Sequence, residues 1–210
     1  VAKTVNVQSS ATSGTVDLTN ASNNLTDLGT IKTLGAAFSY KDTNALASTG
    51  AINTFGANST TGVVGGVVTI TAGGNLGVGA IDTHWGNSST NGVAGANGGA
   101  GNLTTTSTGT ITTSTITTSG GDATGATAAN GGDAGTITFK SNGNTVTLGG
   151  ITASGGALAS GGTAGVSGTV NLGTDAATQA DSVGTVTQTA AMVAKTVNVQ
   201  SSATSGTVDL

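Results

Sequence analysis

The 210-residue sequence contains no cysteine, no proline, no arginine and no glutamate, and it has only five aromatic residues. Without cysteine, the chain has neither disulfides nor thiolate metal ligands. Without proline, no interior strand loses a ladder hydrogen bond. Three Phe, one Tyr and one Trp provide little bulky material, so we expect a thin, narrow core.

Threonine and glycine dominate what is present, with 43 and 37 residues. Both disfavour helix, because threonine loses side-chain freedom against the preceding helical turn and glycine costs about 1 kcal/mol there. Strand is the remaining regular structure. The sequence therefore predicts an all-β protein.

Charged residues are few, and five Lys and nine Asp give a net charge of -4. The lysines are scattered singly, whereas nucleic-acid binding requires clustered basic side chains, so we expect no nucleic-acid partner.

No apolar run reaches the roughly 18 residues of a membrane helix, so we expect no membrane insertion. Any export signal is expected outside this segment.

The stretch VAKTVNVQSSATSGTVDL occupies residues 1–18 and returns unchanged at residues 193–210. We interpret the chain as a window on a tandem array. Residues 1–192 are then one repeat unit, and residues 193–210 are the start of the next identical unit. The second copy is expected to adopt the conformation of the first, one unit farther along the axis.

Two short motifs recur along the chain. The first is an apolar-polar-apolar triplet at residues 16–18, 38–40, 68–70, 137–139, 170–172 and 197–199, with a weaker case at 103. The second is a small residue, then Ile or Val, then polar residues, at 29–33, 50–54, 79–83, 114–118, 149–153 and 184–188. The first apolar residue of the triplet precedes the Ile or Val by 13 to 16 residues, while the return path varies. Alternation of apolar and polar residues marks half-buried strands. A repeat in which one connection between strands keeps its length and the other varies is typical of β-solenoid coils.

The returning segments at residues 87–101, 120–135 and 155–168 consist almost entirely of Gly, Ala, Ser and Asn. Such segments form turns and loops readily, so we expect variable loops on one side of the solenoid. The alternative is a set of flexible linkers between domains. Six to eight coils, each about 4.8 Å from the next, would give a unit about 30 to 40 Å long.

The alternation also predicts an inward face, stacked in rows between coils. An aspartate at Ile151 would bury an unpaired carboxylate there and destabilise the fold strongly. The residues expected to be buried are Val16, Leu18, Leu28, Ile31, Ile52, Val68, Ile70, Ile81, Ile116, Ile137, Phe139, Val146, Leu148, Ile151, Val170, Leu172, Val186, Val197 and Val199.

Four stretches, at residues 16–33, 40–54, 67–83 and 131–156, resemble the β-strand repeats of filamentous-haemagglutinin-like giant exoproteins of bacteria. The resemblance covers most of the chain. It implies a right-handed parallel β-helix, exported across the outer membrane and displayed or released as an adhesin or surface fibre, often by two-partner secretion. The Asn-Pro motifs of that family's secretion domain are not present, because the segment has no proline. The unchanged repeat also goes beyond the loosely similar repeats of the family.

His84 and Trp85, the single His beside the single Trp, form the most conspicuous candidate site. They could offer an aromatic platform for sugar stacking beside a polar group. The alternative is a Trp that covers a coil edge or touches a neighbouring rod.

Two aspartates raise the question of a calcium site: Asp122 and Asp133, eleven residues apart in GGDAT and GGDAG. Solvated turn aspartates are favoured, and no metal site is predicted.

The residue types bear on two further functions. Polysaccharide lyases and pectin-cleaving hydrolases also use parallel β-helices, but they need a basic residue or clustered carboxylates at the scissile bond. The threonine run at residues 103–119 could form an ice-binding face, but that function requires the same Thr-x-Thr in every coil of constant length. Exposed strand positions account for the run adequately.

The sequence thus predicts a structural repeat of an extracellular or cell-surface bacterial filament or giant adhesin-like protein. It would assemble end to end into a thin fibre, with no catalytic, cofactor or metal site. Its expected partners are identical units along the fibre axis, and glycans of a host or cell surface are candidate ligands. The alternative function is a carbohydrate-binding surface module that uses the loop side around Trp85.

Overall fold

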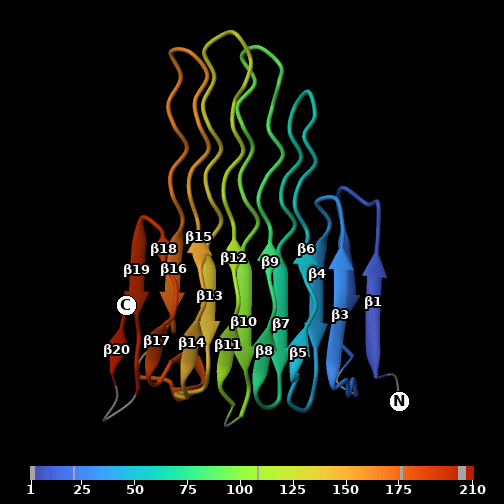
Figure 1. Ribbon diagram of the computed structural model, residues 1–210, viewed down its shortest axis with the longest axis vertical. Coiled ribbons are helices and arrows are strands. Elements are labelled where there is room, and N and C mark those ends of the chain that lie inside the picture. Colours follow the sequence, from blue (N-terminus) through green and yellow to red (C-terminus); the bar gives the residue numbers. More distant parts are fainter. Residues whose placement is uncertain (1–2, 21, 108, 176, 203–206) are drawn as a thin grey trace.

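The computed structural model describes residues 3–20, 22–107, 109–175, 177–202 and 207–210. The described chain is all-β, and its strands form three sheets in which every pair is parallel. The sheets consist of short strands lying side by side in one long row, from β1 at one end to β19 and β20 at the other (Figure 1).

We call the three sheets A, B and C. Sheet A contains β1 (Thr4–Gln8), β3 (Asp27–Lys32), β6 (Ile52–Asn53), β9 (Ile81–Asp82), β12 (Ile116–Thr117), β15 (Ile151–Thr152) and β18 (Met192–Val193), with β5 (Ser48–Thr49) beside β3. Sheet B contains β2 (Thr15–Leu18), β4 (Ala37–Lys41), β7 (Val68–Ala72), β10 (Gly101–Thr105), β13 (Ile137–Lys140), β16 (Thr169–Leu172) and β19 (Thr196–Val199). Sheet C contains β8 (Leu76–Val78), β11 (Ile111–Thr113), β14 (Val146–Leu148), β17 (Val186–Gln188) and β20 (Val208–Asp209). A short 3-10 turn spans Gln179–Asp181.

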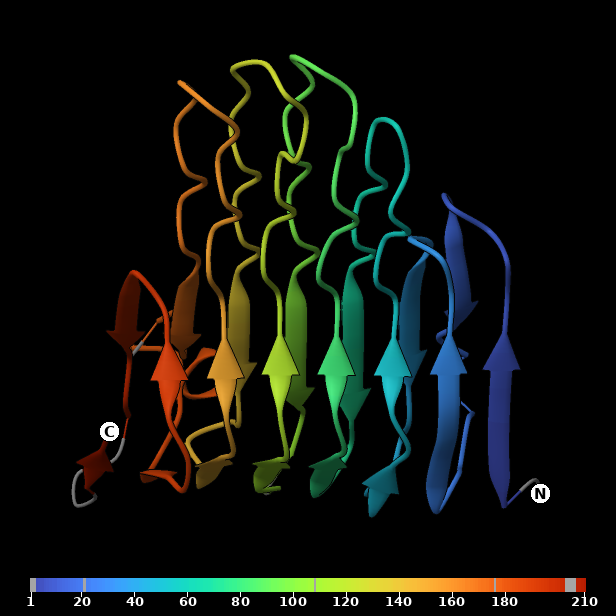
Figure 2. The same cartoon turned by 45° about the horizontal axis from the view of Figure 1, so that its top comes forward.

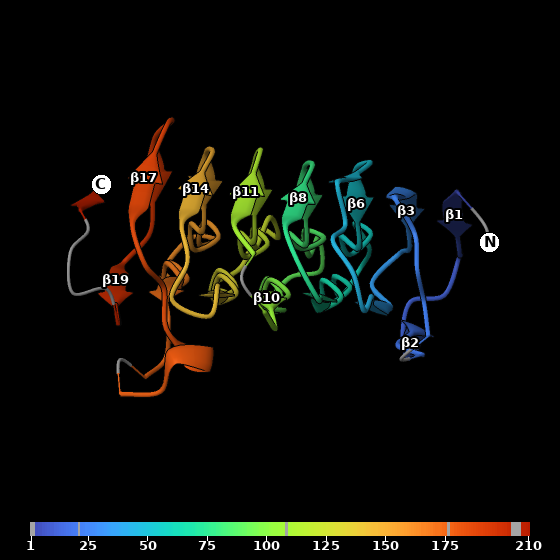
Figure 3. The same cartoon turned by 90° about the horizontal axis from the view of Figure 1, so that it is seen from below.

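The chain visits the sheets in a fixed order. From β7 onward it passes from sheet B to sheet C to sheet A and then returns to sheet B beside the strand it left. We call one such passage a coil. The coils follow one another in a single row when the molecule is seen from below (Figure 3). Parallel sheets visited in this order are compatible with the β-helix that the sequence predicts.

The core lies between the three sheets and is built from rows of side chains that repeat from coil to coil. In sheet A, the row runs through Ile31, Ile52, Ile81, Ile116 and Ile151, each paired in register with the next. These isoleucines are at most 1 % exposed. β-branched side chains fit such a surface because their restricted χ1 rotamers suit the pleated strand.

Fifteen of the nineteen residues predicted to point inward are buried. The other four lie in the first or last coils: Val16, Leu18 and Val199 are partly buried against the core, and Val197 is 37 % exposed. Val197 pairs with Val170, which is fully buried, so its side chain has the inward direction. It is exposed because no further coil covers it within the described residues.

The two sequence motifs occupy two of the three sheets, with one exception. All the triplets, including the weaker one at Leu103, lie in sheet B. The second motif lies in sheet A at five of its six places, but its copy at residues 184–188 forms β17 in sheet C. The second motif therefore does not mark a single sheet, because strands of sheets A and C share the same local alternation. Sheet C was not predicted as a separate series.

The two copies of the eighteen-residue segment form strands at corresponding places but in different sheets. TVNV lies in sheet A as β1 and in sheet B as β19. TVDL lies in sheet B as β2, whereas the described part of its copy, β20, lies in sheet C. The described strands of the second copy therefore do not take the places of the first copy within the coil.

Candidate functional site

Four loops extend the coils beyond the sheets on one side of the molecule. They connect sheet A to sheet B after β6, β9, β12 and β15, and each consists of an outgoing leg and a returning leg (Figures 1 and 2). They cover residues 54–67, 83–100, 118–136 and 153–168. We call the stack of these loops the loop layer; its position on one side agrees with the sequence prediction.

The loop layer is held by backbone hydrogen bonds that run in more than one direction. The N–H of Gly120 donates to Ser154 O in the following coil at 2.9 Å, whereas the N–H of Gly121 donates to Ala96 O in the preceding coil at 3.0 Å. Three positions later, Ala123 and Thr124 repeat these two directions. A three-residue period is that of an extended helix of polyproline type, here bonded to neighbouring legs. These segments are therefore a packed layer rather than the flexible linkers considered as the alternative.

Glycine is required in this layer because the backbones approach closely. A Cβ built on Gly132 would lie 1.8 Å from Ala96 O, and one on Gly165 would lie 1.8 Å from Gly132 O. One on Gly99 would lie 2.4 Å from Gly66 O. Since each carbonyl belongs to the preceding coil, the missing side chains set how closely successive loops stack.

A buried threonine closes the base of each loop but the last. Thr54 accepts a backbone hydrogen bond from the N–H of Gly66 at 2.7 Å, and its Oγ1 donates to the carbonyl of the same glycine at 2.6 Å. The equivalent side-chain bonds run from Thr83 to Gly99 and from Thr118 to Gly135, and Thr33 makes the same bond to Ala36 in the short turn between β3 and β4. All four threonines are fully buried. The polar residue that ends the second motif is thus a clamp between the two legs.

Asparagine and aspartate side chains form a row along the outgoing legs. Asn58 Oδ1 accepts the N–H of Asn87 at 2.7 Å, Asn87 Oδ1 accepts the N–H of Asp122 at 2.9 Å, and Asp122 Oδ1 accepts the N–H of Ala157 at 2.7 Å. A second row on the returning legs joins Asn97, Asp133 and Val166 in the same way. Neither row was predicted from the sequence. The signal was available, because Asn58, Asn87 and Asp122 each follow a clamp threonine by four residues.

The two singled-out residues, His84 and Trp85, lie on the outgoing leg of the second loop but in different surroundings. Trp85 is only 9 % exposed, and its Cδ1 lies against Gly56, where a Cβ would be 2.7 Å away. Its Nε1 has no hydrogen-bond partner among the described residues. His84 is part-exposed: its ring stacks on Phe55 with centroids 5.2 Å apart, and its Nδ1 lies 2.5 Å from Asp82 Oδ1. The indole is thus almost wholly buried beside Gly56 of the preceding coil, so little of its ring is accessible to a ligand.

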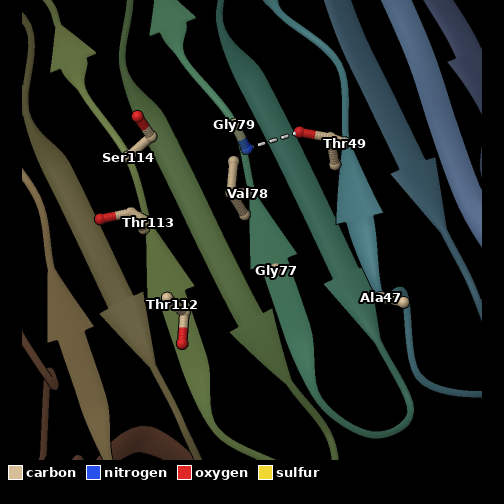
Figure 4. Close-up of a pocket in the computed structure, with 8 residues that line it drawn as sticks. All are labelled: Ala47, Thr49, Gly77, Val78, Gly79, Thr112, Thr113 and Ser114. Atoms are coloured by element: carbon tan, nitrogen blue, oxygen red, sulfur yellow. Dashed lines mark hydrogen bonds between the residues drawn. The ribbon is translucent and has the colours of Figure 1, made fainter.

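One hollow lies over sheet C, where small residues leave space (Figure 4). It has a volume of about 330 Å³. It is lined by Ala47, Thr49, Gly77, Val78, Gly79, Thr112, Thr113 and Ser114. Thr49 Oγ1 already accepts the N–H of Gly79 at 2.9 Å, and no lining residue is charged. The hollow thus offers a few neutral hydroxyl groups, and no carboxylate, imidazole or ammonium group lies among its lining residues.

A second hollow, the outgoing-leg groove, follows the asparagine row and has a volume of about 390 Å³. Because Asn58 Oδ1 and Asn87 Oδ1 are held by backbone N–H groups, the Nδ2 of each is the group left for a ligand. No hydrogen bond of either Nδ2 occurs in the described ranges. The groove is lined by Asn58, Ser59, Thr60, Asn87, Ser89 and Thr124.

The other candidate residues do not converge on a site, and the carboxylates are dispersed. Asp122 and Asp133 belong to the rows on opposite legs, each bonded to a backbone N–H. Across the residues that the structure describes, no three side chains of His, Cys, Asp or Glu lie together as metal ligands would. The threonine run at 103–119 is divided among β10, β11 and β12, in three different sheets, so it forms no single threonine face.

One buried carboxylate has a structural role in the second coil. Asp42, 1 % exposed, accepts the phenolic O–H of Tyr40 at 2.5 Å and the N–H groups of Leu25 and Asn44. Burial and the bond to Asp42 raise the pKa of Tyr40 above its ordinary value. The group is therefore a satisfied polar network that fixes the turn after β4.

In the described part of the chain, no helix has the length and apolar character needed to cross a membrane. Comparisons with protein-family models, with curated proteins and with solved structures gave no match. The resemblance to filamentous-haemagglutinin-like exoproteins therefore stays a prediction. The stack of sheets, the loop layer and the groove described above are the features from which function is inferred.

Proposed function

We propose that this chain is a structural unit of an extracellular bacterial filament or giant adhesin-like surface protein, which stacks end to end into a thin fibre and carries no catalysis. The single observation that carries the proposal is the parallel, in-register ladder. In sheets A and B, strands of seven successive coils pair only with the coil before and the coil after. Such a stack is extended by adding coils, whether the next coil belongs to the same chain or to another.

In this proposal the three sheets close into a right-handed three-sided β-helix. The right hand is supported by sterics, since about 98 % of crossover connections between parallel strands of one sheet are right-handed. The dispersed carboxylates and singly placed lysines support a structural role. Two ion pairs are present in the described residues, one of them between Lys140 and Asp181 at 2.6 Å.

The interface between stacked units is tested with a lysine at Val197. This inward-facing side chain of β19 is 37 % exposed, so a lysine there can reach water in a single chain. A following coil would bury its ammonium group without a partner, which is costly. Asn198→Lys is the matched control, because Asn198 is on the outward side of the same strand and is exposed.

We expect the unchanged chain and Asn198→Lys to form thin filaments by electron microscopy, while Val197→Lys stays folded and short. Intact mass of the denatured filament then separates peptide-linked units from docked ones. Equal filament lengths for all three proteins would show that this edge is not the stacking interface. Lateral sheets or amorphous aggregates of the unchanged chain would contradict the fibre itself.

A second candidate function, carbohydrate binding on the loop side, is favoured by the outgoing-leg groove rather than by Trp85. The Asn58 and Asn87 amides are oriented by their bonds to backbone N–H groups, and serine and threonine hydroxyls lie beside them. Neutral donors and acceptors repeated at the strand spacing of about 4.8 Å suit a saccharide chain, which presents hydroxyls at every sugar. The partner class would be a neutral glycan.

Retention on a glycan array tests this candidate. Asn87→Ala should weaken binding because it removes an oriented donor. Trp85→Phe should leave binding unchanged, because the buried indole does not line the groove. No retention of the unchanged chain on any glycan would remove the candidate without affecting the fibre proposal.

A further inference from the structure

The unchanged repetition of residues 1–18 allows one unit to be placed relative to the next. β1 pairs with β3 in sheet A, whereas its copy β19 pairs with β16 in sheet B. β2 pairs with β4 in sheet B, and the copy β20 pairs with β17 in sheet C. Both strands of the copy are thus displaced by one sheet in the same direction around the coil.

The length of the connecting chain explains this displacement. β18 ends at Val193 in sheet A, and β19 begins at Thr196, so only two residues lie between them. The three Cα–Cα steps from Val193 to Thr196 span about 10 Å when extended, which is enough to reach the neighbouring sheet B. A strand stacked on β18 itself would first have to complete a whole coil. Since β1 also lies in sheet A, its copy cannot follow β18 and keep the same sheet.

The segment packs its apolar side chains against the core in both positions. Val5 and Val7 contact the core from sheet A, and Val199, the copy of Val7, contacts it from sheet B. Val197, the copy of Val5, pairs with the buried Val170 and has the inward direction. The same alternation therefore serves two sheets, and nothing in the segment restricts it to one.

We propose that consecutive 192-residue units are related by a screw that includes one third of a turn, so that each unit makes six and one third turns. From β1, six steps along sheet A lead to β18, and one further sheet leads to β19. This inference rests on the proposed fibre of repeated units. It assigns as partner a second, identical unit, whose first strand continues sheet B and whose second strand continues sheet C.

The consequence concerns the loop layers. In this unit, all four long loops leave between sheet A and sheet B. A following unit displaced by one sheet would project its loops between sheet B and sheet C, and the third unit between sheet C and sheet A. A fibre would thus carry separate loop layers in three directions, and the pattern would repeat after three units, about 90 Å at the strand spacing of about 4.8 Å.

The experiment uses a two-unit chain, in which residues 1–192 are followed by residues 1–210. Its structure is determined by cryo-electron microscopy. Because the chain has no cysteine, Ala128→Cys adds one label site at an exposed loop position of each unit. The distance between the two spin labels, measured by pulsed electron paramagnetic resonance, gives an independent readout. An exposed strand position, Thr152→Cys, serves as the matched control pair close to the axis.

We expect one continuous rod with two loop layers separated by one third of a turn, and a longer label distance at Ala128 than at Thr152. A continuous rod whose loop layers are in line would overturn the inference and leave the fibre proposal standing. Two units that fold without stacking coil on coil would contradict the fibre proposal, and the screw relation with it. The outcomes therefore separate the two claims.

Discussion

At the scale of the residue, two kinds of side chain carry most of the fold. Isoleucines and valines fill inward rows, and threonines close the bases of the loops. The sequence predicts the first kind well, because period-2 alternation is a local property. It predicts the clamp less well: Thr83 ends the motif GAIDT, yet its buried bond to Gly99 joins residues sixteen positions apart. The alternation cannot specify such a partner.

Ile151→Asp tests the inward rows. Ile151 is 1 % exposed and lies between Ile116 and Met192 in neighbouring coils. A carboxylate there is desolvated without a partner, so the loss of unfolding free energy should exceed about 4 kcal/mol. Chemical denaturation measures this loss. Thr152→Asp, on the exposed side of the same strand, should change stability by about 0.5 kcal/mol or less, and equal effects at both positions would mean that the register is wrong.

Thr83→Val tests the clamp. The substitution keeps the shape of the side chain but removes the hydroxyl that donates to Gly99 O at 2.7 Å. The loss of this buried bond should cost about 1–3 kcal/mol. We expect a lower melting temperature and faster amide exchange in residues 83–100. Thr152→Val, at an exposed strand position, is the control, and a clamp variant as stable as this control would exclude the role assigned to Thr83.

His84 makes stability depend on pH near neutrality. The hydrogen bond to Asp82, opposed in part by burial, raises the pKa of His84 above 6.5 in the folded chain. The stabilising contribution is therefore complete below pH 6.5 and is lost as pH rises through the folded-state pKa. Melting temperature should therefore fall modestly as pH rises above about 6.5.

His84→Gln is the control for this titration, because His84 is the single histidine of the chain. The variant should show a flatter melting profile across the same range. If the slopes of the two proteins were the same, the pair of His84 and Asp82 would not contribute to stability.

At the scale of the element, the loops differ most from what the sequence suggests. Gly, Ala, Ser and Asn predict turns, and the chain indeed leaves the sheets at these segments. Their order comes from contacts between coils, such as the bond from Gly120 to Ser154, thirty-four residues away. Composition alone cannot distinguish a packed glycine layer from a flexible linker, because both lack large side chains. The three-residue period of the contacts becomes visible only when the coils are aligned.

Gly132→Ala tests the packed loop layer. The new Cβ would lie 1.8 Å from Ala96 O, so the legs must separate, at a cost of about 1–3 kcal/mol. Gly101→Ala is the matched control, because nothing lies within 4 Å of a Cβ at that position. Differential scanning calorimetry should show a lower melting temperature for Gly132→Ala alone. A loop layer that tolerates both changes would be loosely packed, contrary to this description.

The assignment of strands to sheets shows where prediction from sequence ends. The triplets were recognised in the sequence as one recurring motif, and all of them lie in sheet B, because the strands of that sheet are four or five residues long and strongly alternating. Sheet C was missed because its strands are at most three residues, and one of them, VTQ at Val186–Gln188, has the motif of sheet A. The sheet that a strand joins depends on how far along the coil the strand lies, and not on its local sequence pattern.

At the scale of the whole molecule, the same principle explains the duplicated segment. TVNV serves in two sheets because the chain path, through the two residues after β18, decides where the strand lies.

The candidate site was less predictable from the sequence than the fold. His84 and Trp85 attracted notice as rare residues, but the structure buries Trp85 and gives the outgoing-leg groove to common asparagines and hydroxyls. Rarity in composition does not indicate exposure.

X-ray diffraction from aligned filaments tests the central claim, a fibre of stacked parallel coils, most directly. The strands lie across the direction in which the coils stack (Figure 1). We therefore predict a strong reflection at about 4.8 Å along the filament axis and an axial unit repeat of about 30 Å. A reflection at about 4.8 Å perpendicular to the axis would place the strands along the fibre and contradict the account.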